Sequence, residues 1–222
     1  MHKKGHILKL MGAVRTISLV LAALAVLLVG SRAAQASGLS QAEMGRLLRG
    51  ETVKRPQSLE VSGRRYVGGL AYVIVDADPN GLTPLLSNVD DWPHILPSAR
   101  SARRVGELGG DTLVEMTHGS ALVQAKYTMR VHRGTREVTF WMDPRHSHDI
   151  EDAWGFLRAE PLSGERTLVV YGVLIDMGPG LLRDLFEGTV RRLALSVPDR
   201  VRAFAEERDR VAQATYRQTA RP

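Results

Sequence analysis

The sequence predicts an α+β domain in which a curved antiparallel sheet of about seven strands wraps around a long C-terminal helix, with two short helices after the first strand. Three observations predict this fold class. Residues 101–142 are divided by glycines into short segments rich in β-forming residues. Residues 166–176 are apolar on both faces, which is typical of a strand inside a sheet. After residue 181 the apolar residues recur at helical spacing.

Residues 37–65 are expected to form an N-terminal extension with one short amphipathic helix. Ser40 and Glu43 have the spacing of a capping box, and Gly50 marks the end of the helix. Its apolar stripe, which includes Leu47, either docks on the domain or covers a ligand opening.

Residues 66–75 are aromatic and β-branched, and they predict the first strand. Asp78 suits the N-cap of a following helix and Pro79 suits its first turn. A second short turn is expected near residues 90–93.

Six further strands are expected after these helices, and their spacing favours an antiparallel meander. They cover residues 101–108, 112–117, 121–133, 136–142, 153–159 and 166–176. In two of them apolar residues alternate with polar ones: Tyr127 and Met129 share one face, as do Val138 and Phe140. The sheet should therefore have one apolar face and one face in contact with water.

A long amphipathic helix is expected after the glycines at positions 178 and 180. Pro198 interrupts it, because proline lacks the N–H that an inner helical turn requires. The helix should kink there or restart, with Ser196 as the new cap. Residues 66–210 make up the predicted domain, and residues 211–222 are expected to be a polar tail.

The N-terminus has the three parts of a signal peptide in order. Lysines near the start are followed by an apolar run of 13 residues, Ile17–Val29, and by the small residues of Ala34–Ala36. The run is shorter than the roughly 20 residues of a membrane-spanning helix. We expect residues 1–36 to be cleaved near Ala36 and the protein to be exported, to the periplasm or the medium. An uncleaved anchor is the alternative.

Composition limits the classes of function. The chain has no cysteine, so an exported fold must be held together without disulfides. Residues 1–36 hold five of the 30 Lys and Arg and none of the 24 Asp and Glu, so the remaining 186 residues are nearly neutral. Without a concentrated basic face, binding to nucleic acid is not expected. The sequence does not determine an oligomeric state.

A curved sheet around one helix does not always fill the space between them, so an apolar pocket is expected. The residues that match a known family are Val75–Pro79, Leu85–Pro93, Trp154 and the strand that runs into Gly178–Gly180. On these residues the chain resembles the START-like, helix-grip (SRPBCC) superfamily of polyketide cyclases and lipid transport proteins, in particular its coenzyme Q-binding branch. The resemblance implies a cavity for a hydrophobic ligand.

The apolar residues expected to face the sheet interior or the helix are the candidate lining of this pocket. They are Trp92, Met116, Met129, Val131, Phe140, Met142, Trp154, Tyr171, Leu182, Phe186 and Leu193. Plain core packing is the alternative role for any of them. The direction of Trp154 is open, because Ala153 and Leu157 make the competing face of its strand.

Three polar residues in predicted strands are candidates for acid/base chemistry in the same pocket: His118, Glu115 and Arg158. If Met116 faces inward, alternation places His118 inward as well. The segment 146–152 contains histidines and carboxylates, but it is expected to be a solvated loop and no metal site is predicted. No cofactor is expected either.

Three functions are consistent with these patterns. The first is an exported protein that binds or carries a lipid, sterol or quinone, with the segment Trp92–Pro97 as a gate and transient membrane contact possible. The second is a cyclase- or hydrolase-like enzyme that uses His118, Glu115 or Arg158. The third is an interaction module with a filled core. We expect binding rather than catalysis.

Overall fold

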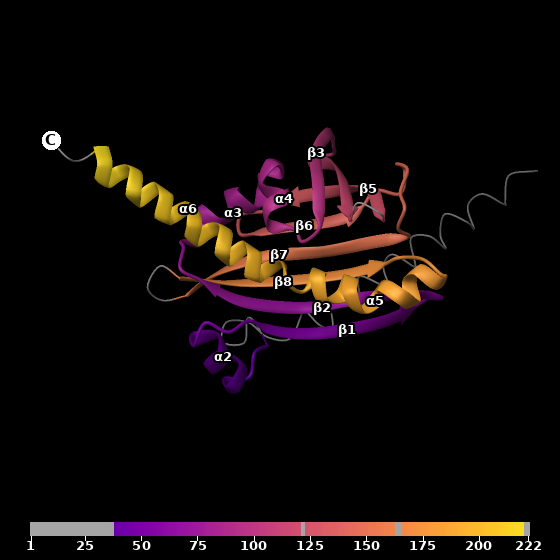
Figure 1. The fold of residues 1–222 in the computed structure, drawn as a ribbon, viewed down its shortest axis with the longest axis horizontal. Helices are drawn as coiled ribbons and strands as arrows, with labels where there is room; N and C mark the ends of the chain where they lie inside the picture. Colours follow the sequence, from indigo (N-terminus) through magenta and orange to yellow (C-terminus); the bar gives the residue numbers. More distant parts are fainter. Residues whose placement is uncertain (1–37, 121–122, 163–165, 220–222) are drawn as a thin grey trace, which may run out of the picture. The chain divides into compact units, whose positions relative to one another are not determined.

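The computed structural model describes residues 38–120, 123–162 and 166–219, so the predicted signal peptide lies outside the described residues. Residues 41–222 form one compact unit (Figure 1). A single antiparallel sheet has the strand order β1-β2-β8-β7-β6-β5-β4-β3. The strands are β1 (Val53–Val61), β2 (Arg64–Val75), β3 (Ala99–Leu108), β4 (Asp111–Gly119), β5 (Gln124–Arg133), β6 (Glu137–Met142), β7 (Asp152–Leu162) and β8 (Arg166–Asp176).

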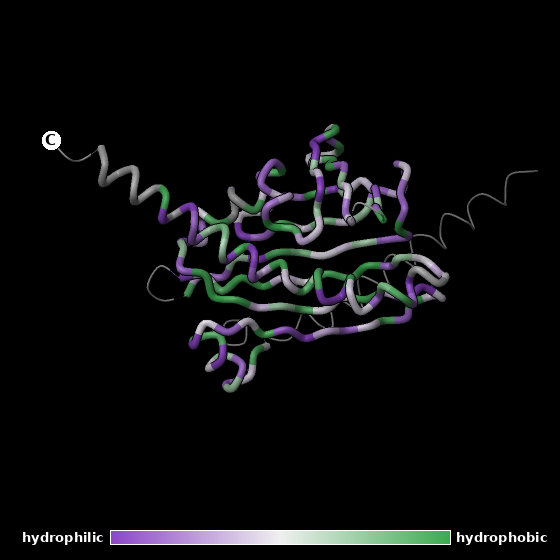
Figure 2. Tube along the Cα trace, viewed as in Figure 1, coloured by the Kyte–Doolittle hydropathy of each residue, from purple (hydrophilic) through white to green (hydrophobic). Residues whose placement is uncertain are grey.

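The α+β class with an antiparallel sheet and a C-terminal helical region is confirmed, but the sheet has eight strands rather than about seven. The extra strand is β1, which pairs along its length with β2. The sheet therefore begins at Val53, and not at residue 66 as the sequence suggested. Because β1 is an edge strand and mostly exposed, its residues are polar and include Pro56, which an edge strand tolerates. Figure 2 shows the contrast between hydrophilic β1 and hydrophobic β2.

The predicted inner position of the most apolar strand is confirmed. β8 lies between β2 and β7, and nearly all of its side chains are buried. The pairing of β2 with β8 joins the first hairpin of the sheet to the end of the meander formed by β3 to β8. A strand with neighbours on both edges and buried side chains on both faces is expected to be mostly apolar, as residues 168–175 are.

The helices are α2 (Gln41–Leu48), α3 (Pro79–Ser87), the 3-10 helix η1 (Val89–Asp91), α4 (Trp92–Ile95), α5 (Leu181–Ala194) and α6 (Val197–Thr219). Within the described residues, no helix is long and apolar enough to cross a membrane. Helix α2 packs beside β1 and β2: Leu47 is buried, and Glu43 forms an ion pair of 2.6 Å with Arg55. Leu47 of the predicted apolar stripe thus packs on the domain, whereas Leu48 is 57% exposed.

The C-terminal helix is divided in two. Helix α5 ends at Ala194 and α6 begins at Val197, so Pro198 lies in a first turn, where its missing N–H costs nothing. The Ser196 hydroxyl donates to the Leu193 carbonyl at the end of α5 (2.7 Å). Of the two expected outcomes, the structure shows the restart, but the Ser196 side chain bonds the end of α5 instead of capping α6 as predicted. Helix α6 continues to Thr219, through most of the segment expected to be a polar tail.

The hydrophobic core lies between the concave face of the sheet and the helices (Figure 1). Val197, Val201 and Ala205 of α6 are four residues apart and all are buried, so one stripe of this helix packs on the sheet. Helices α3 and α4 contribute Leu82, Leu86 and Trp92 to the same core.

Replacing Gly188 by alanine is expected to raise the free energy of unfolding by about 0.5–1 kcal/mol. Gly188 lies inside α5, and a Cβ added there would have no neighbour within 4 Å. Alanine restricts the unfolded chain and favours the helix without a steric cost. Chemical denaturation measures the effect, and a midpoint below that of the natural protein would contradict it.

Candidate ligand-binding cavity

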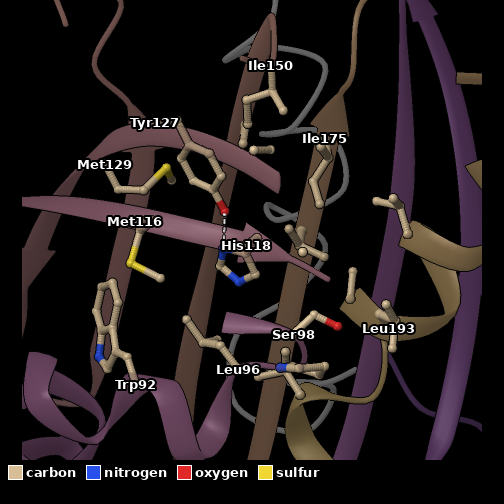
Figure 3. Close-up of a pocket in the computed structure, with 18 of the residues that line it drawn as sticks. Trp92, Leu96, Ser98, Met116, His118, Tyr127, Met129, Ile150, Ile175 and Leu193 are labelled. Atoms are coloured by element: carbon tan, nitrogen blue, oxygen red, sulfur yellow. Dashed lines mark hydrogen bonds between the residues drawn. The ribbon is translucent and has the colours of Figure 1, made fainter. Parts of the chain in front are cut away.

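A cavity of about 710 Å³ lies between the concave face of the sheet and helices α4, α5 and the start of α6 (Figure 3). Its volume is within the range of sites that bind small molecules. Most of the lining is apolar. The lining residues are Leu86, Trp92, Ile95, Leu96, Pro97, Ser98, Met116, His118, Gly119, Ser120, Val123, Gln124, Ala125, Tyr127, Met129, Val138, Phe140, Asp149, Ile150, Ala153, Leu157, Tyr171, Val173, Ile175, Met177, Phe186, Thr189, Val190, Leu193, Ala194 and Val197.

Strand alternation builds the wall of the cavity. Met116 and His118 are two apart on β4, and Tyr127 and Met129 are two apart on β5. Because Met116 pairs with Tyr127 in the register of the two strands, all four side chains meet on the concave face (Figure 3). Methionines at such a wall can adjust to ligands of irregular shape.

Trp92 at the start of α4 is part of the cavity wall. The indole N–H donates a hydrogen bond to the Leu86 carbonyl (3.0 Å), which fixes the ring against α3. The side chain is buried, and Ile95 lies beside it in the core. The segment expected to act as a gate thus forms part of the cavity wall.

Several residues that line the cavity are also exposed to solvent, and they come from the residue before β5, the segment before β7, and α5. Val123 before β5 is 49% exposed and Phe186 of α5 is 39% exposed, and both line the cavity. Asp149 and Ile150 line the cavity from the segment before β7, and the Asp149 carboxylate accepts a hydrogen bond from the Lys126 amide (2.8 Å). An opening with apolar residues on its rim follows from this arrangement.

Two polar side chains face each other inside the cavity. The Tyr127 hydroxyl lies 2.9 Å from Nδ1 of His118, and the two rings stack with centroids 5.7 Å apart (Figure 3). Burial lowers the pKa of His118 to about 4. Burial likewise raises the pKa of Tyr127. Both groups are therefore uncharged at neutral pH, and they form a neutral hydrogen-bonded pair.

A third polar group inside the cavity is Tyr171 of β8. Its side chain is 5% exposed, and its ring packs against Phe140 with centroids 6.3 Å apart. Burial raises its pKa, and the nearby Tyr127 adds to the effect. The two phenols thus lie within electrostatic reach of each other.

Seven of the predicted lining residues line the cavity in the structure: Trp92, Met116, Met129, Phe140, Tyr171, Phe186 and Leu193. Val131 and Met142 are packed in the core and are not among the lining residues. The side chain of Leu182 lies outside the described part of the chain. Trp154 faces the opposite side of the sheet, because the competing face with Ala153 and Leu157 is the one that faces inward.

Two of the three acid/base candidates are not in the cavity. Glu115 is on the outer face of β4, where it pairs with Arg103 and with Lys126 (both 2.9 Å). Arg158 is on the outer face of β7, paired with Glu137. Successive side chains of a strand point to opposite faces. Glu115 is next to Met116 in β4, so it points to the face opposite to that of Met116 and His118. Of the three, only His118 lines the cavity.

The histidine- and carboxylate-rich segment before β7 has ordinary structural partners. Arg145 pairs with Asp143 and holds the pKa of this carboxyl at about 2. Nδ1 of His148 lies 2.7 Å from the Ile150 carbonyl. Among the described residues no group of three or more His, Asp or Glu side chains could hold a metal ion.

Tyr127 was not among the predicted lining residues, although it was expected on the apolar face with Met129. Its alternation was a sufficient signal for an inward position, but its pairing with His118 depends on the register between β4 and β5. Ile150, Ile175 and Val190 were also missed as lining residues. They come from segments that meet only in the folded chain.

The eight-stranded antiparallel sheet, the short helices after β2 and the C-terminal helices define the START-like, helix-grip fold, and this chain has that fold. It is similar to the Zhui aromatase/cyclase from Streptomyces sp. R1128, with 21% identity and a TM-score of 0.57 over 67% of this chain and 97% of that one. It is also similar to a STAR-related lipid transfer protein from Xanthomonas axonopodis, with 12% identity and a TM-score of 0.53 over 68% and 97% of the two chains.

A protein from Thermus thermophilus is comparably similar, with 18% identity and a TM-score of 0.54 over 64% of this chain and 97% of that one. No protein-family model matches the sequence, and the search of curated proteins found no match. At these identities the similarity concerns the fold. It does not single out the coenzyme Q-binding branch, which stays a prediction.

Proposed function

We propose that this protein binds a hydrophobic small molecule in the cavity between sheet and helices and carries it outside the cytosol. The observation that carries the proposal is the cavity itself, which is large, mostly apolar and open at the surface. Transfer of an apolar ligand from water into such a site gains about 0.8 kcal/mol for each buried methylene. A lipid transfer protein of the same fold supports this interpretation.

Export is part of the proposal and rests on the sequence of residues 1–36, with its basic start, apolar run and small-residue site. Transient contact with a membrane is supported by the rim of the cavity. Val123 and Phe186 are exposed there, and the neighbouring Leu185 is 72% exposed. Exposed apolar side chains beside a ligand opening would allow a lipid to pass without crossing water.

An enzyme of the cyclase kind is the second candidate, because one specific observation favours it. The neutral imidazole of His118 faces the cavity and could accept a proton from a bound substrate. The similar Zhui protein is an aromatase/cyclase. The third hypothesis, an interaction module with a filled core, does not fit a cavity of about 710 Å³.

Native mass spectrometry of the protein, purified from an extract that contains its own membranes, tests the carrier proposal. We expect an apolar molecule to co-purify and to be recovered unchanged after denaturation, as a carrier requires and an enzyme does not. The intact mass of the chain reports at the same time whether it begins after Ala36.

The matched variants are Phe140→Asp, which places a charge in the cavity, and Thr139→Asp on the opposite face of the same strand. The first should lose the bound molecule and the second should keep it. Ala153→Leu, which adds apolar volume at the cavity wall, serves as a second variant if Phe140→Asp does not fold. A protein that stays empty after lipids and quinones are added would overturn the proposal.

A further inference from the structure

The polar groups of the cavity restrict the chemistry of its ligand. Among the described residues the lining contains no lysine, arginine or glutamate, and its one aspartate is Asp149 at the exposed rim. His118, the single imidazole among the described lining residues, is neutral at neutral pH. A carboxylate, phosphate or ammonium group inside would therefore be buried without a partner of opposite charge, which is strongly unfavourable.

The interior nevertheless offers hydrogen bonds. Tyr171 lines the cavity and is 5% exposed, and no described residue is hydrogen bonded to its hydroxyl group. A hydroxyl that faces an apolar cavity and has no protein partner can form a hydrogen bond with a ligand there. A ligand oxygen placed against Tyr171 would form that bond.

The Tyr127–His118 pair lines the same cavity, and Tyr127 is within electrostatic reach of Tyr171. Its hydrogen bond of 2.9 Å uses the tyrosine hydroxyl and Nδ1 of the imidazole, which leaves Nε2 as a further polar atom. The neutral imidazole can present Nε2 as a donor or as an acceptor, depending on the tautomer. We call Tyr127, His118 and Tyr171 together the tyrosine–histidine patch. The rest of the lining is mostly apolar, and its other uncharged polar side chains are those of Ser98, Ser120, Gln124 and Thr189.

From this geometry we propose that the ligand is an uncharged apolar molecule with a hydroxyl or carbonyl oxygen, and that the tyrosine–histidine patch binds that oxygen inside the cavity. The inference rests on the proposed function, and it specifies the ligand class of the same site. The cavity walls around the patch, which include Met116, Met129 and Phe140, enclose the apolar body of the molecule.

Displacement of the uncharged dye Nile red by three probes of equal chain length tests the proposal at pH 7.5. The probes are 1-dodecanol, dodecanoate and dodecylammonium, which differ in the charge of the polar end. We expect dodecanol to bind at least about tenfold more tightly than either ion. Tyr171→Phe, which removes one hydroxyl and keeps the ring, should weaken dodecanol binding about five- to tenfold, as expected for one hydrogen bond.

The matched control is Tyr72→Phe, since Tyr72 is a buried tyrosine of β2 that does not line the cavity. It should leave dodecanol binding unchanged. Tyr127→Phe should weaken binding as Tyr171→Phe does. The proposed ligand class is wrong if dodecanoate or dodecylammonium binds as tightly as dodecanol or more tightly. It is also wrong if Tyr171→Phe and Tyr127→Phe both leave the affinity for dodecanol unchanged. Either result would leave the carrier function standing. If neither dye nor probe binds the natural protein, the proposed function fails as well.

Discussion

Acidification from pH 6.5 to pH 4 is expected to lower the free energy of unfolding by about 3 kcal/mol through His118 alone. The buried imidazole has a pKa of about 4 in the folded protein, against an ordinary value of 6.5 in the unfolded chain. Between these values the unfolded chain binds the proton and the folded protein does not. The stabilisation is therefore complete above pH 6.5, and it is lost as the pH falls towards 4.

Urea denaturation at several pH values measures this dependence, with His118→Gln as the comparison because glutamine is polar and does not titrate. The difference between the two proteins should change with pH only in this window. Asp143 does not interfere, because its folded pKa of about 2 places its contribution at lower pH. Parallel stability curves from pH 7 to pH 4 would show that His118 is accessible to protons in the folded state.

Replacing Gly155 by alanine is expected to destabilise the fold by about 3 kcal/mol and to disturb the cavity. A Cβ at this position of β7 would lie 2.2 Å from the Gly172 carbonyl oxygen and 2.6 Å from Cζ of Phe140. Gly155 of β7 is paired with Phe140 of β6 in the register of the two strands, and the Phe140 ring packs over it. The added methyl group must displace the neighbouring backbone or push this ring into the cavity.

Thermal and urea denaturation measure the loss of stability, and the affinity for Nile red measures the change in the cavity. Gly188→Ala is the matched control, because it is the same substitution at a position with no neighbour within 4 Å. If the Gly155→Ala protein has the stability of the natural protein and binds the dye equally well, then the sheet accommodates the added methyl group next to Phe140 without loss of stability.

The candidate site was partly predictable from the sequence, and the limit is physical. Alternation in a strand fixes which residues share a face, and it correctly grouped Met116 with His118 and Tyr127 with Met129. It does not say which of two faces is inward when both carry apolar residues. Trp154 was therefore assigned to the lining although its small neighbours, Ala153 and Gly155, occupy the inner face.

The sequence by itself determined the class of the fold, the meander and the inner position of residues 166–176, because each depends on local periodicity. It also determined the interruption of the C-terminal helix at Pro198, because proline lacks the backbone N–H. Only the tertiary structure decided that the polar segment Val53–Val61 is a strand, since an edge strand can be exposed and lacks an apolar pattern. It also decided the contact between His118 and Tyr127 and the placement of Tyr171, because contacts between strands depend on register and sheet order.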